Sequence, residues 1–148
     1  MVTGILVAAG DGEAAPRFSA KTLDGERYTN ASLAGHPVLI QFWATWCPKC
    51  RGDQSAVDAI TRDYAGQGLV VLAVDVGESK RTVKSYLARS PRSCNIVANE
   101  DSNLPAMFGA KLVPLYILID KDGQIAGEQK GAGGEEMLRQ FLRRAGLE

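Results

Sequence analysis

A nearly continuous apolar run spans Val38 to Trp43 and is broken only by Gln41. It follows the chain-breaking segment 35–37, which contains a glycine and a proline. A continuous run of this kind indicates a strand that is buried on both faces. Leu69 to Val74 repeats the pattern, and Asn95 to Ala98 predicts a shorter strand. We therefore expect a buried, at least partly parallel sheet at the centre of the protein.

Three segments between and after these strands predict helices. Pro48 suits a first helical position, where its missing N–H would have no partner in any case, and a helix should run from there to about Tyr64. Ser79 to Arg89 predicts a second helix with Ser79 as its N-cap. Glu135 to Arg144 is amphipathic, and Gly146 should end it.

Two hairpins complete the pattern. Phe18 to Ala20 and Glu26 to Thr29 flank the turn pair Asp24-Gly25. Leu115 to Ile119 and Gln124 to Gly127 flank a second Asp-Gly pair at 122–123. The order is a βαβ half followed by a ββα half, with an added β-hairpin at the N-terminus. This predicts an α/β fold with a mixed central β-sheet flanked by helices.

Length and composition fit one globular domain. The chain has 148 residues, which is enough for one hydrophobic core. We expect a mobile N-terminal lead-in over residues 1–15, the remnant of an export signal, and a domain over residues 16–146. Seventeen basic residues balance 17 acidic ones, so no strong net field favours nucleic acid as a partner. No segment reaches the ~20 apolar residues of a membrane span.

The chemistry of the chain points to Cys47 and Cys50, which lie two residues apart at the predicted start of a helix. Backbone N–H groups and the positive end of the helix dipole stabilise a thiolate on the first sulfur. The second sulfur lies one turn along the same face, close enough to close a disulfide with the first. Lys49 adds a positive charge beside them. We predict that Cys47 is the nucleophile and Cys50 the resolving thiol.

A structural zinc site is the main alternative use of this pair. Such a site needs two further ligands at suitable spacing. Cys94 and His36 are the remaining candidates, and each lies alone in an unrelated segment. We expect no metal and no cofactor other than a redox-active Cys47–Cys50 disulfide. Cys94 should be structural, and His36 should be a solvated loop residue.

The segment Phe42-Trp43-Ala44-Thr45-Trp46-Cys47-Pro48-Lys49-Cys50-Arg51 resembles the active-site segment of TlpA/ResA-like thiol-disulfide oxidoreductases of the thioredoxin superfamily. The resemblance extends to Ala15-Pro16-Arg17-Phe18, to Leu23-Asp24-Gly25, to Gly35 to Val38, and to Val113-Pro114 followed by residues 119–123. It implies a thioredoxin-like fold and exchange of disulfides with exported client proteins. The implied role is that of a reductant of the cytochrome c maturation type.

The same resemblance assigns roles to further residues. Pro114 should be a cis proline that faces the disulfide, and Val113 should offer backbone hydrogen bonds to a client. Asp53 should be the buried acid that exchanges a proton with Cys50. Its helical stripe, shared with Val57 and Ile60, predicts an inward-pointing carboxyl with apolar neighbours.

The implied partners and location follow from the same family. They are disulfide-bearing clients and a membrane thiol-disulfide electron donor, in the bacterial envelope or periplasm. We expect a monomer that binds no nucleic acid and has no membrane span in this chain. Trp46, Pro48 and Lys49 should form a docking rim beside Cys47, whereas Trp43 should belong to the core.

Two other functions remain open from the sequence. Thioredoxin-fold peroxidases of the AhpC/TSA type share the Ala-Pro-x-Phe opening, but they need Pro and Thr at set positions before the peroxidatic cysteine. Here those positions hold Ala44 and Ile40. The third possibility is a metal-binding thiol carrier that uses Cys47 and Cys50 as ligands without turnover.

Overall fold

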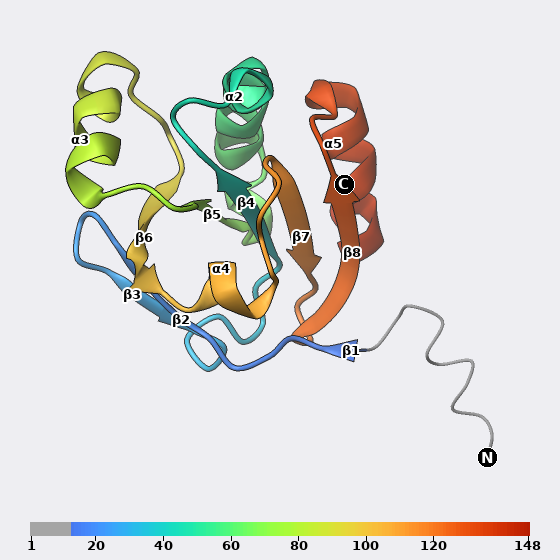
Figure 1. Ribbon diagram of the computed structural model, residues 1–148. Helices are drawn as coiled ribbons and strands as arrows, with labels where there is room; N and C mark the ends of the chain where they lie inside the picture. Colours follow the sequence, from blue (N-terminus) through green and yellow to red (C-terminus); the bar gives the residue numbers. More distant parts are fainter. Residues whose placement is uncertain (1–12) are drawn as a thin grey trace.

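A single eight-stranded sheet forms the centre of the computed structural model, which describes residues 13–148. The strands are β1 (Glu13–Ala14), β2 (Ser19–Thr22), β3 (Arg27–Thr29), β4 (Val38–Trp43), β5 (Val70–Asp75), β6 (Asn95–Ser102), β7 (Leu115–Ile119) and β8 (Gln124–Lys130). Their order across the sheet is β1-β8-β7-β4-β5-β6-β2-β3 (Figure 1). The strand β4 is parallel to β5 and antiparallel to β7, so the sheet is mixed as predicted.

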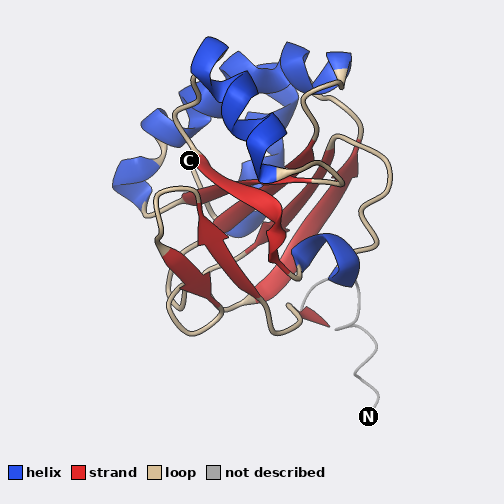
Figure 2. Cartoon of the chain, turned by 60° about the vertical axis from the view of Figure 1, so that its left-hand side comes forward, coloured by secondary structure: helices blue, strands red, loops and turns tan. Residues whose placement is uncertain are grey.

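The helices are α2 (Pro48–Asp63), α3 (Lys80–Arg89), α4 (Leu104–Met107) and α5 (Gly134–Leu142), with short 3₁₀ turns at Ala65–Gln67 and Arg143–Ala145. The helices α2, α3 and α5 lie together on one side of the sheet, and α4 lies apart from them (Figure 2). Within residues 13–148, no helix combines the length and apolar character that crossing a membrane would require.

Successive side chains of β4 point to opposite faces of the sheet, and this divides the core into two layers. Leu39 packs with Val57 and Ile60 of α2 and with Leu138 and Leu142 of α5. The neighbouring positions Val38, Ile40 and Phe42 face the other way and pack with the N-terminal hairpin and with Leu104 of α4. Because both faces of β4 are covered, all six of its residues are buried.

The predicted thioredoxin-like α/β arrangement is confirmed, including the added hairpin β2–β3. The strands β4 and β7 have the predicted bounds. Ser79 caps α3 by accepting from the Thr82 N–H at 3.1 Å. The helix α2 ends at Asp63, one residue before the predicted end.

Residues just outside the predicted domain limits of 16 and 146 take part in the sheet and the core, and the limits themselves stay a prediction. Glu13 and Ala14 form β1, which pairs with β8, and Leu147 is buried. A two-residue edge strand is held by backbone hydrogen bonds, and a side-chain pattern does not predict it. The rest of the predicted lead-in, residues 1–12, lies outside the described residues.

The strands β6 and β8 run several residues past their predicted ends, and one helix was not predicted. The strand β6 runs to Ser102 instead of Ala98, through the polar residues 99–101, because it pairs with the hairpin strand β2. The strand β8 runs to Lys130 instead of Gly127 along its partner β7. The helix α4 has four residues, too few to show a helical period.

Candidate active site

The two cysteines lie where β4 leads into α2, and a disulfide joins them. Cys47 is the N-cap of α2, and its Sγ accepts a hydrogen bond from the Cys50 N–H at 3.1 Å. Pro48 occupies the first helical position, as predicted. The sulfur of Cys47 therefore lies against a helix N-terminus, where backbone N–H groups favour a thiolate after reduction.

The disulfide itself is covered, while the residue before it is not. Cys47 is 2% exposed and Cys50 3%, whereas Trp46 is 65% exposed. Pro48 and Lys49 are exposed as well. Trp46 and these two residues therefore border the surface beside the covered disulfide, and their role as a docking rim for clients stays a prediction.

The cis-proline loop lies directly beside Cys47. The Val113–Pro114 peptide is cis, which confirms the prediction for this bond. The carbonyl oxygen of Val113 lies 3.7 Å from the Sγ of Cys47, although 66 residues separate them in the sequence. The Gly131 N–H fixes the loop from the other side by donating to the Pro114 carbonyl at 2.8 Å. The roles predicted for Val113 and Pro114 in client binding stay predictions.

Asp53 is buried as predicted, at 3% exposed, but its surroundings differ from the prediction. Its Oδ2 accepts from the Tyr116 hydroxyl at 2.8 Å and from the Gly133 N–H at 3.0 Å. Its Oδ1 accepts from the Gly134 N–H at 3.0 Å. The expectation of apolar neighbours is therefore wrong, because the carboxyl caps the N-terminus of α5 from the side. Its role in moving a proton stays a prediction.

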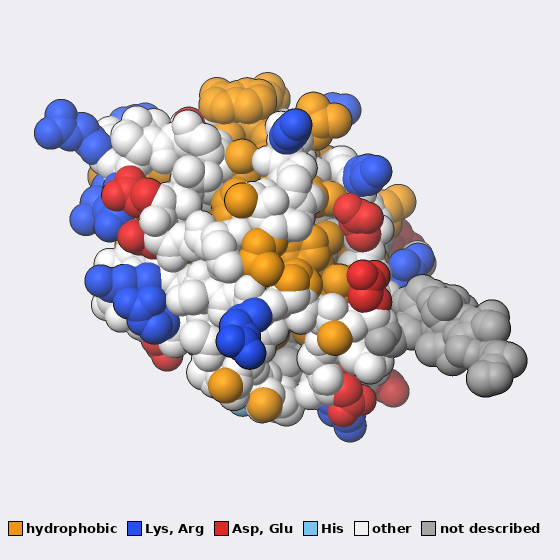
Figure 3. All heavy atoms as spheres, turned by 60° about the horizontal axis from the view of Figure 1, so that its bottom comes forward, with side chains coloured by type: hydrophobic (Ala, Val, Ile, Leu, Met, Phe, Trp, Pro, Cys, Tyr) orange, Lys and Arg blue, Asp and Glu red, His pale blue; other side chains and the backbone are white. Residues whose placement is uncertain are grey.

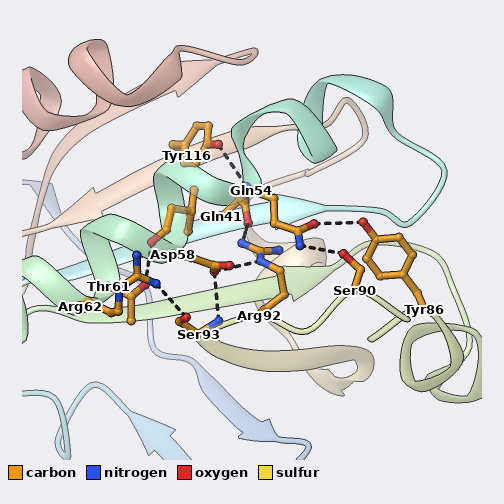
Figure 4. Close-up of polar contacts among 11 residues, drawn as sticks. Gln41, Gln54, Asp58, Thr61, Arg62, Tyr86, Ser90, Arg92, Ser93 and Tyr116 are labelled. Carbon is orange, nitrogen blue, oxygen red and sulfur yellow. Dashed lines mark hydrogen bonds and ion pairs between the residues drawn. The ribbon is translucent and has the colours of Figure 1, made fainter. Parts of the chain in front are cut away.

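A buried hydrogen-bond chain continues from this carboxyl through the sheet. The Gln41 amide donates to the Tyr116 oxygen at 3.1 Å, and Arg92 donates to the Gln41 oxygen at 3.3 Å. Arg92 also pairs with Asp58 of α2 at 3.1 Å (Figure 4). Burial, together with the charge of Asp53, raises the pKa of the Tyr116 phenol above its ordinary value, so this group remains a hydrogen-bond donor.

Two carboxyl groups, those of Glu78 and Asp75, hold the loop before Cys47. The sequence did not predict this arrangement. Glu78 accepts from the Thr45 N–H at 2.8 Å and from the Thr45 hydroxyl at 2.6 Å. Asp75 is fully buried, and its Oδ1 accepts from the Glu78 N–H at 3.0 Å. Burial, with the negative charge of Glu78 adding to it, raises the pKa of Asp75 to about 8. At neutral pH Asp75 therefore keeps its proton, and its second carboxyl oxygen, Oδ2, is buried with no hydrogen-bond partner within residues 13–148.

Residues 12–127 match the family model described as the AhpC/TSA family. The chain belongs to the AhpC/TSA family. Among curated relatives, the thiol-disulfide oxidoreductase ResA of Halalkalibacterium halodurans is 30% identical over 131 residues, covering 88% of this chain and 74% of that protein. ResA of Geobacillus thermodenitrificans is also 30% identical, covering 88% of this chain and 75% of its own length.

Solved structures of thiol-disulfide exchange proteins and thioredoxins are also similar to this AhpC/TSA family member. A putative thiol:disulfide interchange protein DsbE from Chlorobium tepidum superposes with a TM-score of 0.81 at 25% identity, covering 91% of this chain and 96% of that one. A putative thioredoxin from Neisseria meningitidis has a TM-score of 0.77 at 28% identity, covering 90% and 91%. The predicted resemblance is confirmed, and the protein is a thiol-disulfide oxidoreductase with a thioredoxin-like fold.

The remaining predicted residues lie away from the disulfide or inside the core. Trp43 is 2% exposed, as expected for a core residue. Cys94 is a free thiol packed beside the core, and burial raises its pKa to about 11, so it is a poor nucleophile at neutral pH. His36 is exposed, with Nδ1 2.9 Å from the Gly68 carbonyl oxygen. Across residues 13–148, the structure brings no three His, Cys, Asp or Glu side chains into a cluster that could hold a metal ion.

Proposed function

We propose that this protein reduces disulfides in exported client proteins, as expected for a role of the cytochrome c maturation type. The observation that supports this most is the Cys47–Cys50 disulfide at the N-terminus of α2, next to the cis Val113–Pro114 peptide. The confirmed resemblance to ResA-like proteins supports the exported client and the reducing direction. It also supports a location in the bacterial envelope or periplasm.

The exchange follows from the geometry of the pair. The Cys47 thiolate attacks one sulfur of the client disulfide, the client S–S bond breaks, and one client cysteine leaves as a thiolate. The Cys50 thiolate then attacks the Sγ of Cys47, which releases the second client thiolate and closes the Cys47–Cys50 bond. The client gains two electrons and the protein loses two. Because sulfur carries the electrons throughout, the reaction needs no other cofactor.

Asp53 has a place in the second step of this proposal. Cys50 must lose its proton before it can attack, and Asp53 lies one helical turn after it in α2. A carboxylate oxygen has two lone pairs, and Oδ1 of Asp53 accepts one described hydrogen bond, from Gly134. The free lone pair can take the proton of Cys50 and return it to solvent or to the client.

A membrane thiol-disulfide protein would reduce the Cys47–Cys50 disulfide again after each turn. A single domain with one disulfide needs one donor and one client in succession, so we propose that the protein works as a monomer. Exchange with the donor uses the same chemistry in reverse, with Cys47 as the sulfur that is attacked.

Titration of the Cys47–Cys50 pair against a glutathione series tests the reducing direction. A reductant should have a potential near the thioredoxin end of the range, about −270 mV, rather than near the oxidant DsbA, about −120 mV. A potential above about −180 mV would assign the protein to oxidation or isomerisation. The Cys94→Ala variant should give the same potential, because Cys94 has no part in the exchange.

Peroxide reduction is a second candidate, because the matching family model is the AhpC/TSA one. The residues that such a peroxidase needs before its cysteine are replaced here by Ala44 and Ile40. Stopped-flow mixing of reduced protein with hydrogen peroxide separates the two functions. Oxidation no faster than that of a free thiolate at the same pH supports disulfide exchange, and a rate several orders of magnitude higher supports a peroxidase.

A further inference from the structure

The groove beside the cis-proline loop is lined by both apolar and basic residues. It has a volume of about 810 Å³, and Phe108, Leu112 and Val113 lie among its lining residues. Leu112 is 86% exposed, so its apolar side chain is open to a bound segment. Figure 3 shows hydrophobic side chains gathered across one face of the molecule, with Lys and Arg side chains beside them. The basic lining residues of the groove are Lys49, Lys111 and Lys130.

A second groove lies on the opposite side of the α2 N-terminus, between α2 and α3. It has a volume of about 590 Å³ and starts at Thr45, two residues before Cys47. Three arginines line it, namely Arg51, Arg81 and Arg89. Figure 1 shows α3 on one side of α2 and the strands β7 and β8 on the other, so the two grooves flank the disulfide.

The basic side chains of these grooves form no ion pairs within residues 13–148. All six side chains are exposed. Arg51 donates to the Thr45 carbonyl and Arg89 to the Ser85 carbonyl, both neutral acceptors. Glu128 is the carboxylate that lines the first groove, and the second groove has none among its lining residues. The chain as a whole is neutral, with 17 basic and 17 acidic residues, so this charge is a local feature.

From this arrangement we infer that the preferred clients carry acidic residues on both sides of the cysteine that Cys47 attacks. This inference rests on the proposed function and adds the substrate class. An extended client segment that crosses Cys47 places its flanking residues in the two grooves, where carboxylates meet Lys111 and Lys130 on one side and the arginines on the other. Apolar client residues cover Leu112. Complementary charge of this kind raises the rate of encounter and selects among partners.

Three disulfide peptides of identical length test the inference. Each joins two arms through one disulfide, with a fluorophore and a quencher, and the residues beside the cysteines are Glu, Ser or Lys. Dithiothreitol is the electron source because it is uncharged. The wild-type kcat/KM should be about tenfold higher for the Glu peptide than for the Lys peptide, since exposed charge pairs each contribute up to about fivefold. Added salt should reduce this ratio.

Charge reversal supplies the decisive comparison. The double variant Lys111→Glu/Lys130→Glu should bring the ratio of Glu to Lys peptide close to one or below it. The control Lys121→Glu changes the same charge in the turn between β7 and β8, at the end of β7 away from Pro114, and should keep the wild-type ratio. Equal kcat/KM for all three peptides, or a ratio that the double variant leaves unchanged, would overturn the inference while leaving the proposed function in place. Failure to reduce any of the peptides would remove both.

Discussion

Replacing Asp53 with asparagine tests the two roles of this residue separately. The carboxylate accepts three hydrogen bonds, from the Tyr116 hydroxyl and from the N–H groups of Gly133 and Gly134. An asparagine has one acceptor oxygen and one NH₂ group in place of two acceptor oxygens. If its oxygen keeps the contacts with Tyr116 and Gly133, its NH₂ group faces the Gly134 N–H, and one donor of the α5 N-terminus loses its partner.

The expected cost follows from these contacts. An unsatisfied buried donor costs about 1–3 kcal/mol, and Gly134 is only half-buried, which favours the lower end. Loss of a negative charge at a helix N-terminus costs a further ~0.3–1 kcal/mol. We therefore expect Asp53→Asn to lower the free energy of unfolding by about 2 kcal/mol, which corresponds to about 6 °C in Tm for a domain of this size.

Urea unfolding of the oxidised protein measures this loss, with Asp63→Asn as a matched control. Asp63 is also on α2 and also reaches α5, through Arg139 at 2.6 Å, but its side chain is 54% exposed. An exposed pair of this kind contributes at most about 1 kcal/mol. Equal losses in the two variants would refute the capping role of Asp53.

The pH dependence of the resolving step tests whether Asp53 takes the proton of Cys50. In single-turnover release of a client from Cys47, Asp53→Asn should slow resolution near neutral pH and shift the profile, because Cys50 must then give its proton to water. A folded Asp53→Asn protein with the wild-type pH profile would leave Asp53 as a helix cap with no part in the exchange.

Three further substitutions test the buried polar contacts. The folded protein holds the Asp75 proton up to about pH 8, whereas an unfolded chain releases it near ~3.9, so between these values the folded state binds more protons and its stability falls as pH rises. Asp75→Asn should remove this fall in urea midpoints measured between about pH 5 and 8, and an unchanged slope would exclude a protonated Asp75. Glu78→Ala should lower the free energy of unfolding by about 1–2 kcal/mol through loss of both Thr45 contacts, with a smaller loss in Glu78→Gln. Arg92→Met should cost about 3 kcal/mol because it leaves Asp58 without its partner, and the double variant with Asp58→Leu should recover part of that loss.

The parts of the fold that the sequence predicted are those set by local pattern. The apolar run of β4 and the proline at the start of α2 are each visible within a few residues, and they place Cys47 at the helix N-terminus. The cis bond at Pro114 was predicted from the family resemblance.

The contacts that the sequence did not predict join segments far apart in the chain. Asp53 and its backbone partners at Gly133 and Gly134 are separated by 80 and 81 residues, and glycine N–H groups carry no signal in the side-chain pattern. Glu78 meets Thr45 across 33 residues. The Arg92 side chain is buried against the rule for arginines, and its partners Asp58 and Gln41 lie 34 and 51 residues away in the sequence.

The division of labour between the two cysteines can be measured directly by trapping mixed disulfides with a client. The structure places Cys47 beside the exposed Trp46 and the Val113 carbonyl, with Cys50 behind it in α2. A Cys50→Ser variant should therefore accumulate a covalent client adduct on Cys47 that a reductant releases, and Cys47→Ser should accumulate none. Adducts on Cys50 in the Cys47→Ser variant, with none in Cys50→Ser, would contradict the assignment of nucleophile and resolving thiol.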